Sequence, residues 1–252
     1  MPKEKQRINE IKKANANKRI TEKRKEKIPE PIIELSKTKK PITSEQQKKL
    51  DQKLLYAVKE GDTKTVEELL RLGADKNYKI EYGTLERIYI GPERCLSGTS
   101  LLSIASGLGY YDICKLLIEL GVDVNMRETD FGYTPLRWAT YNRSIYTCKL
   151  LIENGAEVNI RDENGRTALF WAAWTGYIDA TRYLLSVGAN PLITDNDRRT
   201  VCDAAGISWS TKEILDKWIR IWKNIGEKRA TNILHAVKDC SPEKMTEIVK
   251  ML

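Results

Sequence analysis

The sequence is poor in the side chains that most often bind metals. It has one histidine, His235, in 252 residues, which excludes zinc sites built on several histidines. Its five cysteines form no CxxC pair: Cys95, Cys114, Cys148, Cys202 and Cys240. Because their number is odd and they are scattered, we expect reduced thiols in an intracellular setting, and no metal site.

Motifs that carry catalysis are missing as well. None of the patterns GxxxxGK[ST], GxGxxG, HExxH and GxSxG occurs, which argues against phosphate-binding loops, dinucleotide sites, metalloproteases and serine hydrolases. His235 and Cys240 are close in sequence, but this proximity alone is not enough to indicate a catalytic dyad. We expect no enzyme activity, no catalytic residues, no cofactor and no small-molecule substrate.

Long apolar stretches are also absent. No run approaches the roughly 18 residues that a membrane span needs. The N-terminus, MPKEKQRINE, has no apolar core of a secretory signal. We therefore expect a cytoplasmic protein, or a nuclear one if it is eukaryotic or is delivered into a eukaryotic host.

Positive charge is concentrated at the N-terminus. The first 49 residues hold 16 basic and 7 acidic residues, which leaves 27 basic and 28 acidic residues for the rest of a chain with net charge +8. The basicity therefore belongs to an arm and not to a folded domain. Residues 3–27 are highly charged with few apolar side chains, so we expect the arm, residues 1–43, to be disordered or loosely helical.

Beyond the arm, the sequence repeats itself. Four segments are alike: Leu69–Asp75, Leu117–Asp123, Leu151–Glu157 and Leu184–Asn190. The last three of their glycines are 34 and 33 residues apart, whereas the first interval of 48 residues holds an insertion. Upstream, TPLRWA at 134–139 recurs 33 residues later as TALFWA at 167–172. A fixed period of this length is typical of a repeat architecture.

This pattern resembles the ankyrin repeat, in which a turn and a TPLH motif precede two short helices and a GAD ending. The resemblance implies an all-α repeat solenoid of helix–turn–helix units with β-hairpin loops, about five repeats plus a degenerate C-terminal cap. We place the ankyrin array at residues 44–225 and capping helices at 226–252. Arg137 and Phe170 replace the motif's histidine, and we expect them to reduce local order there without adding chemistry.

Local signals predict how the helices begin and end and what they bury. The glycine after each second helix predicts a left-handed C-cap. Capping boxes are predicted at Thr43–Gln46 and at Ser210–Glu213, the latter before a helix that runs to about Asn224. Further N-caps are predicted at Asp62, Asp112, Ser144 and Asp179. We expect these side chains to be packed in the core: Cys114, Cys148, Trp138 and Trp171.

In this family the partner usually docks on the concave face, at the loop tips and the exposed positions of the first helices. The resemblance carries that role to six residues here: Phe131, Tyr133, Tyr141, Arg166, Trp174 and Arg199. Tyrosine, tryptophan and arginine are the side chains that dominate interface energetics. For Tyr141 and Trp174, packing between repeats is the alternative.

The insertion at about 78–98 is a second candidate surface. Tyrosine and isoleucine alternate around Gly83, which predicts an elongated β-finger. Tyr82 and Tyr89 on this finger are candidate partner contacts. The alternative is a tolerated surface insertion without a role.

The arm is a third candidate. Five of its basic residues could contact a polyanion weakly: Lys18, Arg19, Lys23, Arg24 and Lys25. The alternative is a solvated arm with no partner. Residues 29–35 differ in composition, because they form a short apolar patch that either packs on the array or acts as a linear motif.

The sequence therefore favours a monomeric, non-catalytic protein–protein interaction scaffold or adaptor that binds an unknown protein partner through the concave face. One alternative is tethering to nucleic acid or an anionic membrane through the arm. Another is a bacterial or viral effector that binds a host protein.

Overall fold

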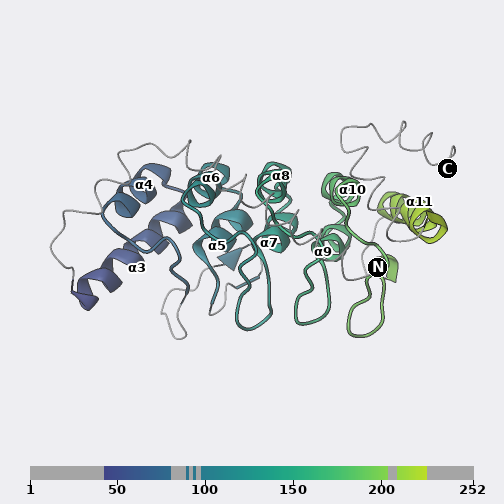
Figure 1. Ribbon diagram of the computed structural model, residues 1–252, viewed down its shortest axis with the longest axis horizontal. Helices are drawn as coiled ribbons and strands as arrows, with labels where there is room; N and C mark the ends of the chain where they lie inside the picture. The colour runs from purple at the N-terminus through teal and green to yellow at the C-terminus, as the bar shows by residue number, and fades with distance from the viewer. Residues whose placement is uncertain (1–42, 81–88, 91–92, 95–97, 204–208, 226–252) are drawn as a thin grey trace, which may run out of the picture.

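The chain forms a row of helix pairs stacked side by side (Figure 1). The computed structural model describes residues 43–80, 89–90, 93–94, 98–203 and 209–225. Within them the pairs are α3 (Ser44–Glu60) with α4 (Thr63–Arg71), α5 (Leu101–Leu108) with α6 (Tyr111–Glu119), α7 (Pro135–Tyr141) with α8 (Ile145–Glu153), and α9 (Ala168–Trp174) with α10 (Ile178–Ser186). The 3-10 helix η2 (Val201–Asp203) and α11 (Trp209–Ile225) follow. The predicted all-α repeat solenoid is confirmed, and the number of repeats stays a prediction.

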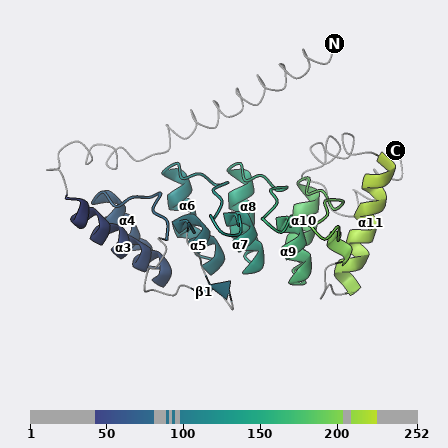
Figure 2. The same cartoon turned by 90° about the horizontal axis from the view of Figure 1, so that it is seen from below.

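The two helices of a pair lie on different sides of the array. In Figure 1, α4, α6, α8 and α10 follow one edge, and the loops between successive pairs project from the opposite edge, beside α5, α7 and α9. Figure 2 shows the same pairs from below as a row that ends at α11. First helices and loops therefore share one face, where a partner-binding surface was expected.

Hydroxyl side chains begin most of the first helices. The predicted capping box at Thr43 is present, and Thr134 and Thr167 each accept a hydrogen bond from the backbone N–H three residues on. These bonds satisfy N–H groups that a helix terminus would otherwise leave without a partner. Arg137 keeps its backbone bond to the Thr134 hydroxyl, at 3.2 Å, and the expectation of reduced local order at this position stays a prediction.

The prediction for the starts of the second helices is confirmed at Asp62 and Ser144 and is wrong at Asp112 and Asp179. Asp62 is an N-cap, and its carboxylate accepts a hydrogen bond from the Thr65 backbone N–H at 3.1 Å. Asp112 and Asp179 instead lie within the first turn, after Tyr110 and Tyr177 as N-cap residues. Ser144 is an N-cap residue without a side-chain capping bond. The aspartates in the first turn still favour the helix, because they lie near its positive end.

The core follows the second helices along the row. Leu117, Leu151 and Leu184 are fully buried at equivalent positions, each followed four residues later by a glycine such as Gly188, whose φ of 99° lies in the left-handed region. The predicted C-cap conformation is therefore confirmed. Burial raises the pKa of the Cys114 thiol to about 12, as expected for a packing residue.

Asparagine side chains tie neighbouring repeats together. The Asn125 amide donates to the Gly155 carbonyl at 3.0 Å, and its oxygen accepts from the Glu157 N–H at 2.8 Å. Asn159 repeats this arrangement with Gly188, at 3.1 Å. Since each bridge satisfies backbone groups of the next loop, the bridges fix the spacing of successive pairs.

The described part of the insertion contains one short antiparallel pair, whereas Gly83, around which the elongated finger is predicted, lies outside the described residues. Strands β1 (Tyr89–Ile90) and β2 (Glu93–Arg94) pair with Tyr89 opposite Arg94, and Lys79 forms an isolated bridge with Ser100. The strands flank residues 91–92, so their pairing is not centred on Gly83 as predicted. Tyr82 lies outside the described residues.

At the C-terminal end, α11 begins at Trp209, before the predicted capping box. Ser210 is therefore inside the helix and is not its N-cap. Leu215 is buried, and Ile214 and Trp218 pack against the core, as the apolar pattern of this helix predicts. The expected arm, up to residue 42, and the capping helices at 226–252 lie outside the described residues.

Candidate partner-binding surface

Aromatic and arginine side chains gather where α7 and α9 meet their preceding loops. We call this group the aromatic–arginine cluster: Phe131, Tyr133, Arg137, Trp138, Tyr141, Arg166, Phe170, Trp171 and Trp174. It contains five of the six residues that the resemblance placed on the concave face. Two helix pairs contribute to it, so stacking of the repeats creates it.

Arg137 occupies the centre of the cluster and is only 3% exposed. Its guanidinium carbon lies 3.7 Å from the ring centroid of Tyr133 and 4.2 Å from that of Trp171. The rings of Trp138 and Tyr141 follow at 4.5 and 5.0 Å. A cation is attracted to the face of an aromatic ring, and more strongly where water is excluded. Arg137 therefore holds rings from two neighbouring repeats around one charge.

Both buried tryptophans are anchored to acidic residues of the loops. The Trp138 indole N–H donates to Glu128 at 2.6 Å, and that of Trp171 donates to Asp162 at 3.0 Å. Asp162 also accepts the backbone N–H of Arg166 at 2.8 Å. Since hydrogen bonds to a carboxylate are strong, each loop is fastened to the first helix that follows it.

The loops are also fastened to one another. The Glu163 N–H donates to the Phe131 carbonyl at 2.9 Å, and the Asn196 N–H donates to the Asn164 carbonyl at 2.9 Å. The approach is close at Gly165, where a Cβ would lie 2.9 Å from the Asn196 nitrogen and φ is +80°. Together these contacts hold successive loops at a fixed spacing.

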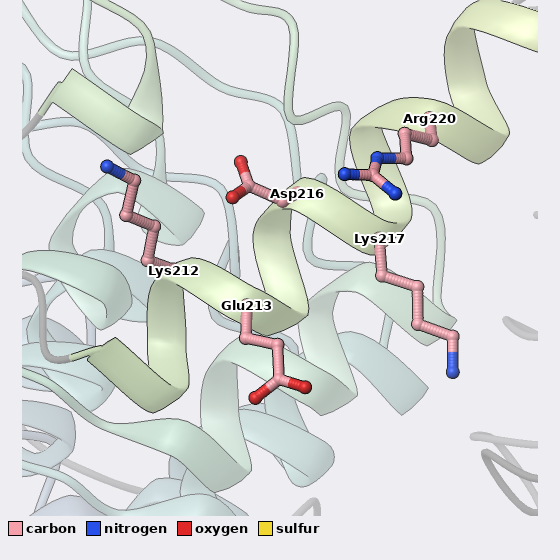
Figure 3. A pocket seen from close by; sticks show the side chains of 5 residues that line it. All are labelled: Lys212, Glu213, Asp216, Lys217 and Arg220. Carbon is pink, nitrogen blue, oxygen red and sulfur yellow. The ribbon is translucent and has the colours of Figure 1, made fainter.

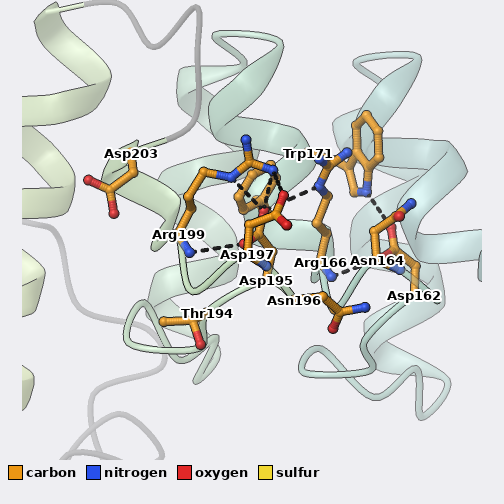
Figure 4. A network of polar contacts seen from close by, with 12 residues as sticks. Asp162, Asn164, Arg166, Trp171, Thr194, Asp195, Asn196, Asp197, Arg199 and Asp203 are labelled. Carbon is orange, nitrogen blue, oxygen red and sulfur yellow. Dashed lines mark hydrogen bonds and ion pairs between the residues drawn. The ribbon is translucent and has the colours of Figure 1, made fainter.

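A second polar network continues the surface beyond the cluster (Figure 4). The buried carboxylate of Asp195 accepts hydrogen bonds from the Arg199 backbone N–H, at 2.9 Å, and from its side chain, at 3.0 Å. The Arg166 guanidinium lies 3.7 Å from the same carboxylate. Burial opposes ionisation of Asp195, but the bonds from Arg199 outweigh it and hold the pKa below its ordinary value. An ionised Asp195 thus orients both arginines.

The exposed part of the cluster lies at its two ends. Phe131 and Trp174 are each 40% exposed. Phe131 stacks on Tyr133 with ring centroids 5.3 Å apart, and Trp174 stacks on Phe170 at 6.3 Å. These two apolar side chains are therefore accessible to a partner while one face of each ring is packed.

The predicted contact residues thus divide into two groups. Phe131, Trp174 and Arg199 are exposed, and Arg166 is half-buried between Asp195 and the rings of the cluster. Tyr133 and Tyr141 are half-buried and pack against the core.

Tyr141 corrects one expectation. Its ring lies edge-on to Trp138 and Trp171, with centroids 6.3 Å from each, so it is not an exposed first-helix side chain. The alternative of packing between repeats describes Tyr141 better than an exposed first-helix position does.

The remaining predicted contact residues are not placed by the structure. For Tyr89 only the strand backbone is described. The five basic residues of the arm lie outside the described residues: Lys18, Arg19, Lys23, Arg24 and Lys25.

Sequence reasoning missed the role of Arg137 and of the loop carboxylates. Arg137 was noted only as a departure from the histidine of the motif. A usable signal was the spacing of an acidic residue and a tryptophan, ten residues from Glu128 to Trp138 and nine from Asp162 to Trp171. An acidic residue nine or ten residues before a tryptophan in two consecutive repeats indicates a loop-to-helix bond.

A cavity of about 580 Å³ beside α11 is lined by charged residues of that helix: Lys212, Glu213, Asp216, Lys217 and Arg220 (Figure 3). Their side chains point in different directions, so they form no converging set of acid, base and nucleophile. In the described part of the chain, no three or more histidine, cysteine or acidic side chains are grouped to hold a metal ion. None of the described helices is long and apolar enough to cross a membrane.

Comparison with known families gives a direct match. A family model described as ankyrin repeats, in three copies, matches residues 54–162 and 101–195. The two matches overlap and together cover more than half of the chain. They include both helix pairs that form the aromatic–arginine cluster.

Proposed function

Because the chain belongs to the ankyrin-repeat family, whose members generally are protein-interaction modules, we propose that it is a non-catalytic scaffold or adaptor for a protein partner. We propose that the partner binds the exposed side of the aromatic–arginine cluster and the neighbouring loop tips. The observation that carries this proposal is the pair Phe131 and Trp174, two large apolar side chains that are each 40% exposed at the two ends of the cluster.

The surface has the chemistry of an interface centre. Trp174 lies beside Arg166, whose guanidinium carbon is 5.9 Å from its ring centroid, and tryptophan and arginine are enriched among the residues that carry binding energy. The rings are already stacked, so little side-chain entropy is lost when a partner covers them. The rings of this surface are thus already ordered before a partner binds.

The proposal is tested by capture of partners with the wild-type chain and with Trp174→Ala. Truncation of a tryptophan that carries binding energy typically costs about 2 kcal/mol or more, which weakens binding roughly thirtyfold. Tyr146→Ala is the matched control, because Tyr146 is 72% exposed on α8, away from the cluster. Equal loss in both variants, or no loss in Trp174→Ala, would show that the partner binds elsewhere.

The charge of the arm supports a second candidate function, tethering to nucleic acid or to an anionic membrane. Its basic residues include Lys18, Arg19 and Lys23–Lys25. Such binding should weaken steeply with salt and vanish when residues 1–40 are deleted. Binding that is insensitive to salt, or that survives the deletion, would rule this function out.

A further inference from the structure

The first helix pair has an exposed face whose counterparts are buried in the later pairs. Tyr56 stands five residues before Gly61, which has a left-handed φ, as Ile104, Trp138 and Trp171 stand before equivalent left-handed residues. Tyr56 is 51% exposed, whereas the three counterparts are between 0% and 7% exposed. In the α9–α10 pair, Trp171 at this position contacts Tyr141 of the preceding pair, with ring centroids 6.3 Å apart, and α3 has no preceding pair among the described residues.

A groove of about 600 Å³ marks this open face. Its apolar part includes Tyr56, Ala57 and Leu69, and Lys49 and Lys53 lie on α3, N-terminal to Tyr56. The rest of its described lining is polar or acidic: Gln52, Glu60, Asp62 and Thr65. Figures 1 and 2 show α3 and α4 at the purple end of the array, with the other described helices on one side of them. A solenoid needs a cap at such an end, because an uncovered stacking face is partly apolar.

We propose that residues Pro31–Leu35 of this chain bind in the groove and act as the N-terminal cap of the array. This inference goes beyond partner binding and concerns a different surface from the aromatic–arginine cluster. The segment reads Pro-Ile-Ile-Glu-Leu, and it is the apolar part of an otherwise charged arm. It adds a binding site within the chain, with a short apolar peptide carrying one carboxylate as its ligand.

The length of chain available fits this placement. Residues 36–43 lie between the segment and the start of α3, and an extended chain of that length spans up to about 28 Å. Tyr56 follows Thr43 by 13 residues, which is about 20 Å along a helix. The linker is therefore long enough for the segment to reach the groove.

The chemistry of the segment also fits. Ile32, Ile33 and Leu35 offer aliphatic side chains to the apolar part of the groove. Glu34 offers a carboxylate to Lys49 and Lys53 in the lining of the groove. The same short peptide would thus bury its aliphatic side chains in the groove and pair its carboxylate with a lysine.

Size favours this occupant over a second copy of the chain. The described lining of the groove has nine residues, whereas a stable interface between separate proteins uses about 20–30 residues on each side. A tethered segment acts at an effective concentration in the millimolar range, so a small surface is enough to hold it.

Photo-crosslinking tests the placement. The photoreactive residue p-benzoylphenylalanine is introduced at Tyr56 in the full chain, and at the exposed Tyr146 as a control. We expect crosslinks from position 56 to the tryptic peptide 28–37 within one monomer, and no such crosslink from position 146. A crosslinked dimer, crosslinks to other peptides only, or no crosslink from position 56 would overturn the proposal.

A second pair of variants tests the chemistry. Ile33→Asp should lower the yield of the crosslink from position 56 about tenfold, because a charge replaces an apolar side chain in the groove. Ile20→Asp lies in the same arm outside the segment and should leave the yield unchanged. Circular dichroism checks that both variants retain their helices. Equal yields in the two variants would overturn the assignment of residues 31–35.

Discussion

Replacing Arg137 by alanine tests whether a buried cation organises the aromatic–arginine cluster. The side chain is 3% exposed, and four rings lie within 5.0 Å of its guanidinium carbon. Truncation of a large buried side chain typically costs about 2–5 kcal/mol because it leaves a cavity. A desolvated cation–π contact contributes about 2 kcal/mol. Removing a buried charge offsets part of this loss. We expect the free energy of unfolding to fall by about 3 kcal/mol.

Urea unfolding followed by circular dichroism measures this loss. Arg137→Met separates the two contributions, because methionine refills much of the volume without the charge, and we expect it to lose about 1–2 kcal/mol. Arg182→Ala, at an exposed position on α10, is the control and should change stability by less than about 0.5 kcal/mol.

Two outcomes would refute the reasoning. If Arg137→Met were as stable as the wild type, the positive charge would contribute nothing and only its volume would matter. If Arg137→Ala lost less than about 1 kcal/mol, the rings would hold their arrangement without any side chain between them.

Three further predictions follow from the buried polar and thiol groups. Trp138→Phe removes the hydrogen bond to Glu128 and should lower the free energy of unfolding by about 1.5–3 kcal/mol in the same urea assay. The folded-state pKa of Asp195 is lowered, so its contribution is present above the ordinary aspartate pKa of about 4 and is lost as the pH falls through the lower folded-state value. Thermal unfolding below about pH 4 should therefore depend less on pH in Asp195→Asn than in the wild type. Burial raises the pKa of Cys148, like that of Cys114, to about 12, so mass spectrometry should find both thiols alkylated by iodoacetamide only after unfolding.

The features that repeat with the sequence period were predictable from the sequence. Glycines such as Gly155 and Gly188 recur because each second helix ends in the left-handed region, at φ values of 94° and 99°. Thr134 and Thr167 recur because each first helix needs the same cap. A physical requirement that returns in every repeat leaves a pattern that one sequence is enough to reveal.

Features that depend on contacts between different repeats were not predictable in the same way. Arg137 is buried because Tyr133 and Trp138 of its own repeat and Trp171 of the next one surround it. Taken alone, an arginine at this position is expected to be solvated. The position of Asp112 could not be predicted for a different reason. An acidic residue favours both the N-cap and the first turn of a helix, and sequence spacing does not separate these two positions.

The same contacts explain why the candidate surface is divided into a packed centre and two exposed ends. Stacking of α7 on α9 places Arg137 among the rings at the centre of the cluster. Phe131 and Trp174 lie at its two ends and are each 40% exposed, while each stacks on a ring of the cluster. A partner that covers both rings should bind with little change in the helix pairs, because the orientation of each ring is already set by its neighbours.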